Sequence, residues 1–87
     1  MFYVYILKSE TTSKRYIGYS TDLKRRILEH NNKKCRSTSF DGPWELVYYE
    51  AFKLENDARR EEIFLKTGKG RERIKFLFNS YQSGVIV

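Results

Sequence analysis

The chain has 87 residues, of which 40% are hydrophobic and 16% aromatic, enough to bury one core but not two. Its net charge of +6 favours a polyanionic partner, and its single cysteine, Cys35, excludes both an intramolecular disulfide and a Cys/His zinc cluster. The apolar run at the start is too short for a signal peptide or a membrane span. We therefore expect a single domain over residues 1–87 in a reducing, cytoplasmic setting.

The first predicted elements are two strands joined by a polar loop. FYVYILK, residues 2–8, and RYIGYS, residues 15–20, are rich in the β-branched and aromatic side chains that strands favour. The polar residues 9–14 between them indicate a β-hairpin. Gly18 lies inside or just after the second strand, where a glycine is typical of a bulge or of a close approach by another backbone or a ligand.

A helix follows the hairpin. Ser20, Thr21 or Asp22 can cap its start, and the helical pattern ends near His30. Residues 32–43 then form a predicted loop, which contains a Gly-Pro breaker.

The remainder of the chain predicts one strand and two helices. WELVYYEAF, residues 44–52, is typical of a strand, and a helix starts near Glu55 and stops at Gly68. A last short helix is predicted within residues 71–82. Its inward-facing side chains are expected to be Ile74, Leu77 and Phe78. The order β-β-α-β-α-α predicts an α+β fold with a small, three-stranded, mostly antiparallel sheet flanked by helices.

Positive charge is concentrated in two segments, one on each side of the third strand. Residues 24–36 hold six basic residues and residues 66–75 hold five, against one acidic residue in each. If both segments border one cleft, they form a rim that binds phosphates; the alternative is two solvated helix faces. The predicted nucleic-acid-binding residues are Lys24, Lys33, Lys34, Arg36, Lys66, Lys69 and Arg71.

Tyrosines mark the predicted hairpin as a place where chemistry could occur. Tyr3 and Tyr5 are two residues apart and share one face of the sheet. Tyr16, on the second strand, is expected across from one of them. The alternative interpretation is that these tyrosines are ordinary core and edge aromatics.

The first predicted helix carries an arginine and the histidine at helical spacing. Leu23, Ile27 and His30 share a face, and Arg26 flanks it one turn before His30, while Arg25 is expected to point to the far side. A guanidinium at the margin of a core needs an anion, and a phosphate matches its fork. A solvated arginine and a buried structural histidine are the alternatives.

Two adjacent glutamates lie close to the inner face of the second predicted helix. That face is defined by Leu54, Ala58 and Leu65. Glu61 falls near its middle and Glu62 near its edge. Either carboxylate could pair with Arg59 or Arg60, or could hold a divalent metal, which prefers oxygen ligands. Periodicity does not decide between the two glutamates.

Taken in order, these motifs resemble the GIY-YIG nucleases, in particular their small standalone bacterial members. YVY, residues 3–5, stands where the family has GIY, and YIG, residues 16–18, matches the second half of the name. TDLKRRILEHN resembles the family's Arg/His helix and aligns Arg26 and His30 with it.

The second helix completes the resemblance. ARREEIFLKTGKG resembles the family's helix in which the functional glutamate lies four residues before a lysine, and counting back from Lys66 selects Glu62. Tyr19 follows YIG where some repair-nuclease relatives carry a lysine. A polar residue is frequent in the family's last helix, and Asn79 is the candidate here.

The resemblance implies a metal-dependent endonuclease that hydrolyses phosphodiester bonds in nucleic acid, with DNA as the expected substrate and DNA repair or processing as the role. Glu62 would hold Mg²⁺ or Mn²⁺, and Gly18 would be structural. The implied catalytic residues are Tyr5, Tyr16, Arg26, His30 and Glu62. Two alternatives stay open: a module of the same fold that binds nucleic acid without cutting it, and oligomerisation or docking through the apolar tail, residues 84–87.

Overall fold

A computed structural model describes residues 1–33 and 38–78 of the chain. Its elements are β1 (Phe2–Ser9), β2 (Arg15–Ser20), α1 (Leu23–Asn31), β3 (Trp44–Phe52), α2 (Glu55–Leu65) and α3 (Gly68–Leu77). The predicted α+β order β-β-α-β-α-α is therefore confirmed. Lys34, Arg36 and Asn79 lie outside the described residues, as does the tail over 84–87.

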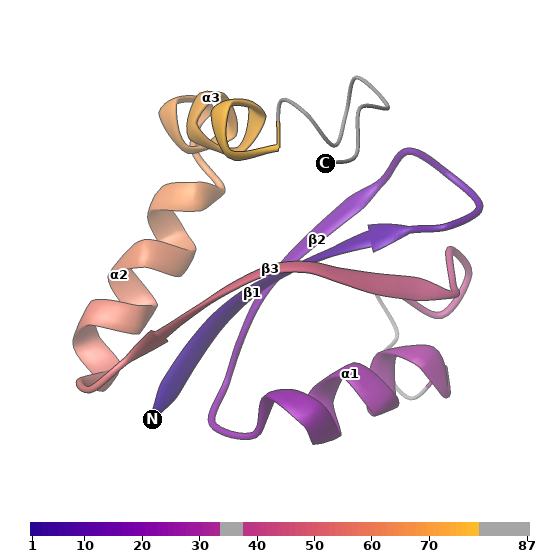
Figure 1. Cartoon of the computed structure of the whole chain (residues 1–87), viewed down its shortest axis with the longest axis horizontal. Helices are drawn as coiled ribbons and strands as arrows, with labels where there is room; N and C mark the ends of the chain where they lie inside the picture. Colours follow the sequence, from indigo (N-terminus) through magenta and orange to yellow (C-terminus); the bar gives the residue numbers. More distant parts are fainter. Residues whose placement is uncertain (34–37, 79–87) are drawn as a thin grey trace.

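The three strands form one antiparallel sheet in the order β2-β1-β3 (Figure 1). β1 is the central strand, and its residues from Val4 to Leu7 are almost completely buried. A register shift between Ile6 and Leu7 interrupts the pairing of β1 with β3. The pairing of β1 with β2 is continuous, so β2 is a regular strand with one free edge.

Alternation along β1 builds a core on each face of the sheet. Val4 and Ile6 pack in a cluster with side chains of α2 and α3, whereas Tyr5 and Leu7 pack with Trp44 and against α1. Figure 1 shows the corresponding three layers, with α1 on one side of the sheet and α2 and α3 on the other. Successive residues of β2 therefore face different layers, and Tyr16 faces the α1 side.

The helix ends decide which residue caps α1, and they correct the predicted end of α2 and the predicted start of α3. Asp22 is the cap of α1, because its side chain accepts a hydrogen bond from the Arg25 backbone N–H. α2 does not continue to Gly68 but ends at Leu65. Thr67 caps a new helix by accepting from the Gly70 N–H, so α3 begins three residues before the predicted start of the last helix. Within the described residues, no helix has the length and apolar character needed to cross a membrane.

Candidate active site

A buried hydrogen-bonded chain links β1, α1 and the loop before β3. The Tyr5 hydroxyl lies 2.8 Å from His30 Nε2, and His30 Nδ1 lies 2.8 Å from the Thr38 hydroxyl. Tyr5 and His30 are at most 1% exposed, and Thr38 is buried with them. Thr38 also accepts a hydrogen bond at its carbonyl from the Trp44 indole N–H. The imidazole is therefore held at both nitrogens in one orientation.

The His30 ring is neutral at neutral pH. Burial lowers its pKa to about 4, and the nearby Arg26 guanidinium acts in the same direction, against the opposing effect of Glu29. A neutral imidazole has one N–H and one acceptor nitrogen, so it donates to one hydroxyl of the chain and accepts from the other. His30 is thus suited to orient Tyr5 and unsuited to carry a positive charge.

Tyr16 lies beside this chain, although not directly across from Tyr3 or Tyr5 as the sequence suggested. In the strand register Tyr16 faces Leu7, and the residue opposite Tyr5 is Gly18. The Tyr16 ring reaches the cluster diagonally, with its centroid 6.2 Å from that of Tyr5 and 4.7 Å from that of His30. Two tyrosines and the histidine therefore form one aromatic group.

Gly18 makes this aromatic group possible. A Cβ atom there would lie 2.4 Å from the Tyr5 hydroxyl oxygen and 2.8 Å from Cε1 of Tyr16. The glycine is needed for the close approach of two side chains, and not for a bulge, because β2 is regular at this point. This assigns a physical cause to the predicted structural role of Gly18.

Arg26 lies one turn before His30 and forms an ion pair with Glu29. Its Nη1 is 3.0 Å from Oε1 of Glu29, and Arg25 binds the other oxygen of the same carboxylate at 3.0 Å. The Arg25 side chain is 61% exposed, against 33% for Arg26, as expected for a residue that points away from the apolar face, yet it shares a partner with Arg26. The hydrogen bond from Arg26 is the main cause that lowers the pKa of Glu29. Arg25 also lies 3.6 Å from Asp22 Oδ2, so the two arginines of α1 share two carboxylates.

The two glutamates of α2 face different strands. Glu61 lies toward β3 and shares a hydrogen bond with Glu50; this bond, burial and the charge of Glu50 raise the pKa of Glu61 to about 7. Glu62 lies toward β2, with its side chain 17% exposed, Oε2 3.2 Å from Lys66 Nζ and Oε1 3.9 Å from Arg59 Nη1. The structure therefore places Glu62, and not Glu61, on the side of the sheet edge that carries Tyr16.

Arg59 is itself held in place on this side of α2. Its guanidinium carbon lies 3.7 Å from the centroid of the Tyr19 ring, and its Nη2 lies 3.7 Å from Glu55 Oε2. The Tyr19 hydroxyl donates to the same Glu55 oxygen over 2.9 Å. Tyr19, at the position where some relatives carry a lysine, thus helps to anchor a cation beside Glu62.

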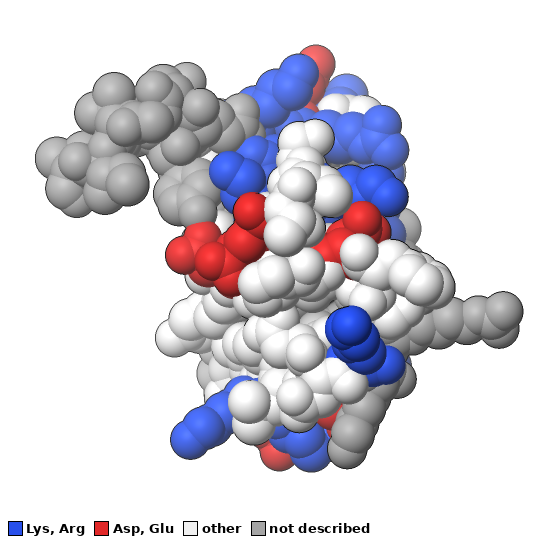
Figure 2. All heavy atoms as spheres, turned by 90° about the vertical axis from the view of Figure 1, so that its right-hand side faces the viewer, with Lys and Arg blue, Asp and Glu red and all other residues white. Residues whose placement is uncertain are grey.

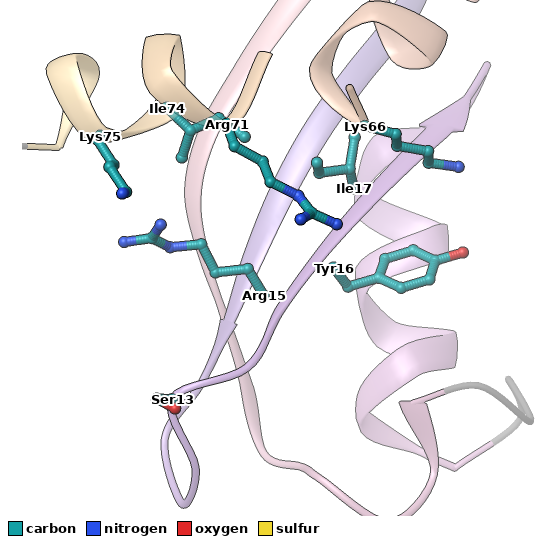
Figure 3. A pocket seen from close by; sticks show the side chains of 8 residues that line it. All are labelled: Ser13, Arg15, Tyr16, Ile17, Lys66, Arg71, Ile74 and Lys75. Atoms are coloured by element: carbon teal, nitrogen blue, oxygen red, sulfur yellow. The ribbon is translucent and has the colours of Figure 1, made fainter. Parts of the chain in front are cut away.

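A groove of about 490 Å³ wraps around the free edge of β2 and connects the two parts of the site. Tyr16 lines it from the aromatic group, and Lys66 lines it from the Glu62 side. Figure 3 shows both side chains pointing in the same direction at one end of the groove. Its complete lining is Ser13, Arg15, Tyr16, Ile17, Lys66, Arg71, Ile74 and Lys75. One end of the groove is therefore formed by Tyr16 and Lys66.

The predicted basic residues divide into two groups. Lys66 and Arg71 line the groove, whereas Lys24 lines a separate depression with Tyr3 and Tyr49. Lys33 and Lys69 are exposed and do not line the groove. Among the residues described, the groove takes its predicted cations from the second basic segment only. Figure 2 shows Lys and Arg side chains gathered at the upper end of the molecule, where Figure 1 places α3.

The sequence interpretation missed three residues of this site. Thr38, which holds His30, lies in a segment that had been interpreted only as a loop. Arg15 lines the groove without belonging to any motif, and Lys75, although counted in the basic segment 66–75, was not among the predicted nucleic-acid-binding residues. The available signals were weak: Arg15 directly precedes YIG, and Lys75 lies four residues after Arg71.

The donor atoms near Glu62 fit a magnesium-type ion bound through few protein ligands. Within residues 1–33 and 38–78, no group of three His, Cys, Asp or Glu side chains could form a complete metal cage. Mg²⁺ is commonly held by one or two carboxylates, with water and substrate phosphate oxygens completing its shell. Glu62 would be the carboxylate that holds such an ion, which would replace the cations Lys66 and Arg59 beside its two oxygens.

Comparison with known proteins agrees with this geometry. The model of the GIY-YIG catalytic domain family matches residues 1–75. The chain belongs to the GIY-YIG family. That match spans Tyr5, Tyr16, Gly18, Arg26, His30 and Glu62.

Bacterial relatives are similar over nearly the whole chain. A UPF0213 protein of Pediococcus acidilactici is 36% identical and covers 99% of this chain and 87% of the relative. A UPF0213 protein of Staphylococcus haemolyticus is 37% identical over 86% of this chain and 92% of the relative. The solution NMR structure of a UPF0213 protein from Bacillus halodurans is also similar, with 36% identity, a TM-score of 0.54, and coverage of 88% of this chain and 85% of that chain.

Proposed function

We propose that this GIY-YIG domain is an endonuclease that hydrolyses phosphodiester bonds in nucleic acid, with DNA as the expected substrate, and that it acts in DNA repair or processing. The observation that carries the proposal is the position of Tyr16. Its ring contacts the buried Tyr5–His30 pair, and it lines a cationic groove together with Lys66, the partner of Glu62. A basic groove next to an oriented phenol and a carboxylate suits an attack on a phosphate group.

The structure favours Tyr16 over Tyr5 as the general base. A base must come within hydrogen-bond reach of the water whose proton it takes. Tyr5 is 0% exposed and already hydrogen-bonded to His30, so it cannot contact a substrate without rearrangement of the core. Tyr16 lines the groove together with Lys66 and Arg71, so its hydroxyl is placed to reach a bound phosphate and the attacking water. Tyr5 and His30 are then positioning residues.

The remaining roles follow from charge. Water attacks phosphorus as its proton passes to the deprotonated oxygen of Tyr16; the bond between phosphorus and the 3′ oxygen breaks, and the leaving 3′ oxygen takes a proton from solvent. Negative charge grows on the phosphate oxygens, and the Arg26 guanidinium stabilises it by donating paired hydrogen bonds. Mg²⁺ or Mn²⁺ bound at Glu62 would supply charge neutralisation at a phosphate oxygen and at the leaving oxygen.

A binding module that does not cut is the second candidate. It is favoured by the two cations that already face Glu62, since Arg59 and Lys66 each lie beside one of its oxygens. In such a module the carboxylate would only fix the basic side chains that bind the nucleic acid.

The test compares Glu62→Gln with Glu72→Gln, a matched change of an exposed glutamate on α3. Labelled single-stranded, duplex and branched DNA and matching RNA are incubated with Mg²⁺, Mn²⁺ or EDTA, while circular dichroism follows the fold. We expect E62Q to lose at least 100-fold in cleavage rate with its fold and nucleic-acid binding intact, and E72Q to be unchanged. Full activity of E62Q contradicts the proposal. Binding without cleavage by the unmodified protein favours the module.

A second pair of variants tests the choice of base. Removing the hydroxyl in Tyr16→Phe is expected to lower kcat by about 10² or more, the range of general base catalysis. Tyr5→Phe leaves the Tyr16 hydroxyl in place and is expected to lower kcat less. A larger loss in Y5F than in Y16F, with both variants folded, would reverse the two roles.

A further inference from the structure

The charged residues that line the groove are all cations. Arg15 comes from β2, Lys66 from the end of α2, and Arg71 and Lys75 from α3. Like charges at positions i and i+4 of a helix, as in Arg71 and Lys75, destabilise that helix slightly. A bound anion would remove this repulsion, so the arrangement favours a ligand with negative charge.

Packing of α3 explains why these cations converge. Ile74 is buried against the sheet, and Arg71, one turn before it, and Lys75, the next residue, flank it at the edge of β2. The buried Phe78 lies beneath the Arg15 guanidinium, whose central carbon is 5.6 Å from the ring centroid. The cations are therefore positioned by core residues, and an apolar floor of Ile17 and Ile74 lies between them.

The cations follow one another along the groove away from Tyr16. Figure 3 shows the charged ends of Arg15 and Lys75 at one end, the Arg71 guanidinium in the middle, and Lys66 with the Tyr16 hydroxyl at the other end. A single phosphate would engage one part of this row. Four cations in a groove of about 490 Å³ suit a ligand with several regularly spaced negative charges.

We propose that this groove binds the sugar–phosphate backbone of the substrate strand on one side of the cleaved bond. The scissile phosphate would lie at the Tyr16 end, and the phosphates that follow it would contact Arg71, then Arg15 and Lys75. The position of the scissile phosphate at the Tyr16 end rests on the proposed nuclease function; the binding of a nucleic-acid backbone by the groove does not. Contacts to phosphates carry no sequence information, so the groove would set affinity and register and would not select a base sequence.

Two double variants of equal charge test this proposal. Arg71→Gln with Lys75→Gln removes two cations from the groove, and Lys53→Gln with Arg60→Gln removes two exposed cations elsewhere. Binding of labelled single-stranded and duplex oligonucleotides is measured by fluorescence anisotropy in EDTA between 50 and 200 mM salt, and thermal melting verifies the fold.

The groove variant is expected to weaken binding at least tenfold at the lowest salt concentration. The slope of log K against log [salt] should become shallower by about 1.4 for single strands and about 1.8 for duplex, which corresponds to two lost phosphate contacts. The control variant should change the affinity less than twofold. Equal weakening in both variants would overturn the proposal, as would unchanged binding in the groove variant.

The outcome is distinguishable from that of the nuclease test. If cleavage is lost in E62Q while R71Q/K75Q binds nucleic acid normally, the proposed nuclease function is supported and the groove proposal is refuted. If nothing is cut but R71Q/K75Q still binds more weakly than its control, the groove is confirmed in a binding module. Preference of the folded protein for anionic lipid vesicles over oligonucleotides, lost in R71Q/K75Q, would also overturn the proposal.

Discussion

Replacement of Gly18 by alanine should break the aromatic group at the centre of the site. The added Cβ would lie 2.4 Å from the Tyr5 hydroxyl oxygen and 2.5 Å from Tyr5 Cζ. Ordinary contacts of a Cβ begin at 3.4 Å, so the Tyr5 ring must move by roughly 1 Å. The hydrogen bond from Tyr5 to His30, 2.8 Å long and fully buried, cannot survive such a displacement unchanged.

Two energetic contributions add up to the expected loss in the free energy of unfolding. Overpacking of a core costs about 1–3 kcal/mol. Breaking a buried hydrogen bond and leaving its partners unsatisfied costs about 1–3 kcal/mol more. The sum, about 2–6 kcal/mol, is a large part of the stability of a small domain, and it corresponds to a decrease in Tm of at least about 8 °C.

Thermal and urea unfolding of three variants provide the measurement. Gly68→Ala is the matched control, because a Cβ at Gly68, in the first turn of α3, meets nothing within 4 Å; it should be neutral or stabilising by up to about 1 kcal/mol. In a Tyr5→Phe background the hydrogen bond is already absent, so G18A should cost about 1–3 kcal/mol less than in the unmodified protein. A stability of G18A within about 0.5 kcal/mol of that of G68A would refute the close-approach argument.

The remaining predictions concern pH. The pKa of His30 is lowered to about 4, so the stability that the neutral ring contributes is present above pH 6.5 and is lost as pH falls through 4. NMR titration of the ring should show no protonation between pH 5.5 and 8. A midpoint above pH 6 would contradict burial as the cause of the lowered pKa. The pH dependence due to Glu61 has the opposite sign. Its pKa is raised to about 7, so the free energy of unfolding should fall by about 1–2 kcal/mol, after allowance for its partial exposure, as pH rises from 4.5 to 7. Urea unfolding at pH 5 and 8 should show that Glu61→Gln removes this dependence; an equal change in both proteins would exclude the Glu50–Glu61 pair as its cause.

The fold was largely predictable from the sequence because its elements have local signatures. The run of β-branched and aromatic residues in β1 and the apolar spacing in α1 depend on residues close in sequence, and both predictions are confirmed. The boundary between α2 and α3 was predicted wrongly because Gly68 was interpreted as a helix end. The actual break depends on Thr67, whose hydroxyl caps a helix that starts with that glycine. A glycine alone does not distinguish the end of one helix from the start of the next.

The candidate site was predictable only where a motif marks it. Periodicity alone did not choose between Glu61 and Glu62, and only the family resemblance selected Glu62; in the structure the two side chains diverge, Glu61 toward Glu50 and Glu62 toward Lys66. Arg15 and Lys75 are 60 positions apart and meet only because α3 packs across the edge of β2. No spacing rule applies to such a pair, so the groove could not be predicted from the sequence.

The two tyrosines of the motifs differ because β1 is central and β2 is at the edge. β1 has both edges paired and helices packed on both faces, so Tyr5 has no access to solvent, and its hydroxyl is hydrogen-bonded to His30. An edge strand leaves one flank open, and Tyr16 can contact the buried His30 ring while it lines the groove. The same residue type therefore serves once to hold the site rigid and once to face the substrate. This division predicts that substitutions of Tyr5 lower stability and activity together, whereas substitution of Tyr16 by phenylalanine lowers activity alone.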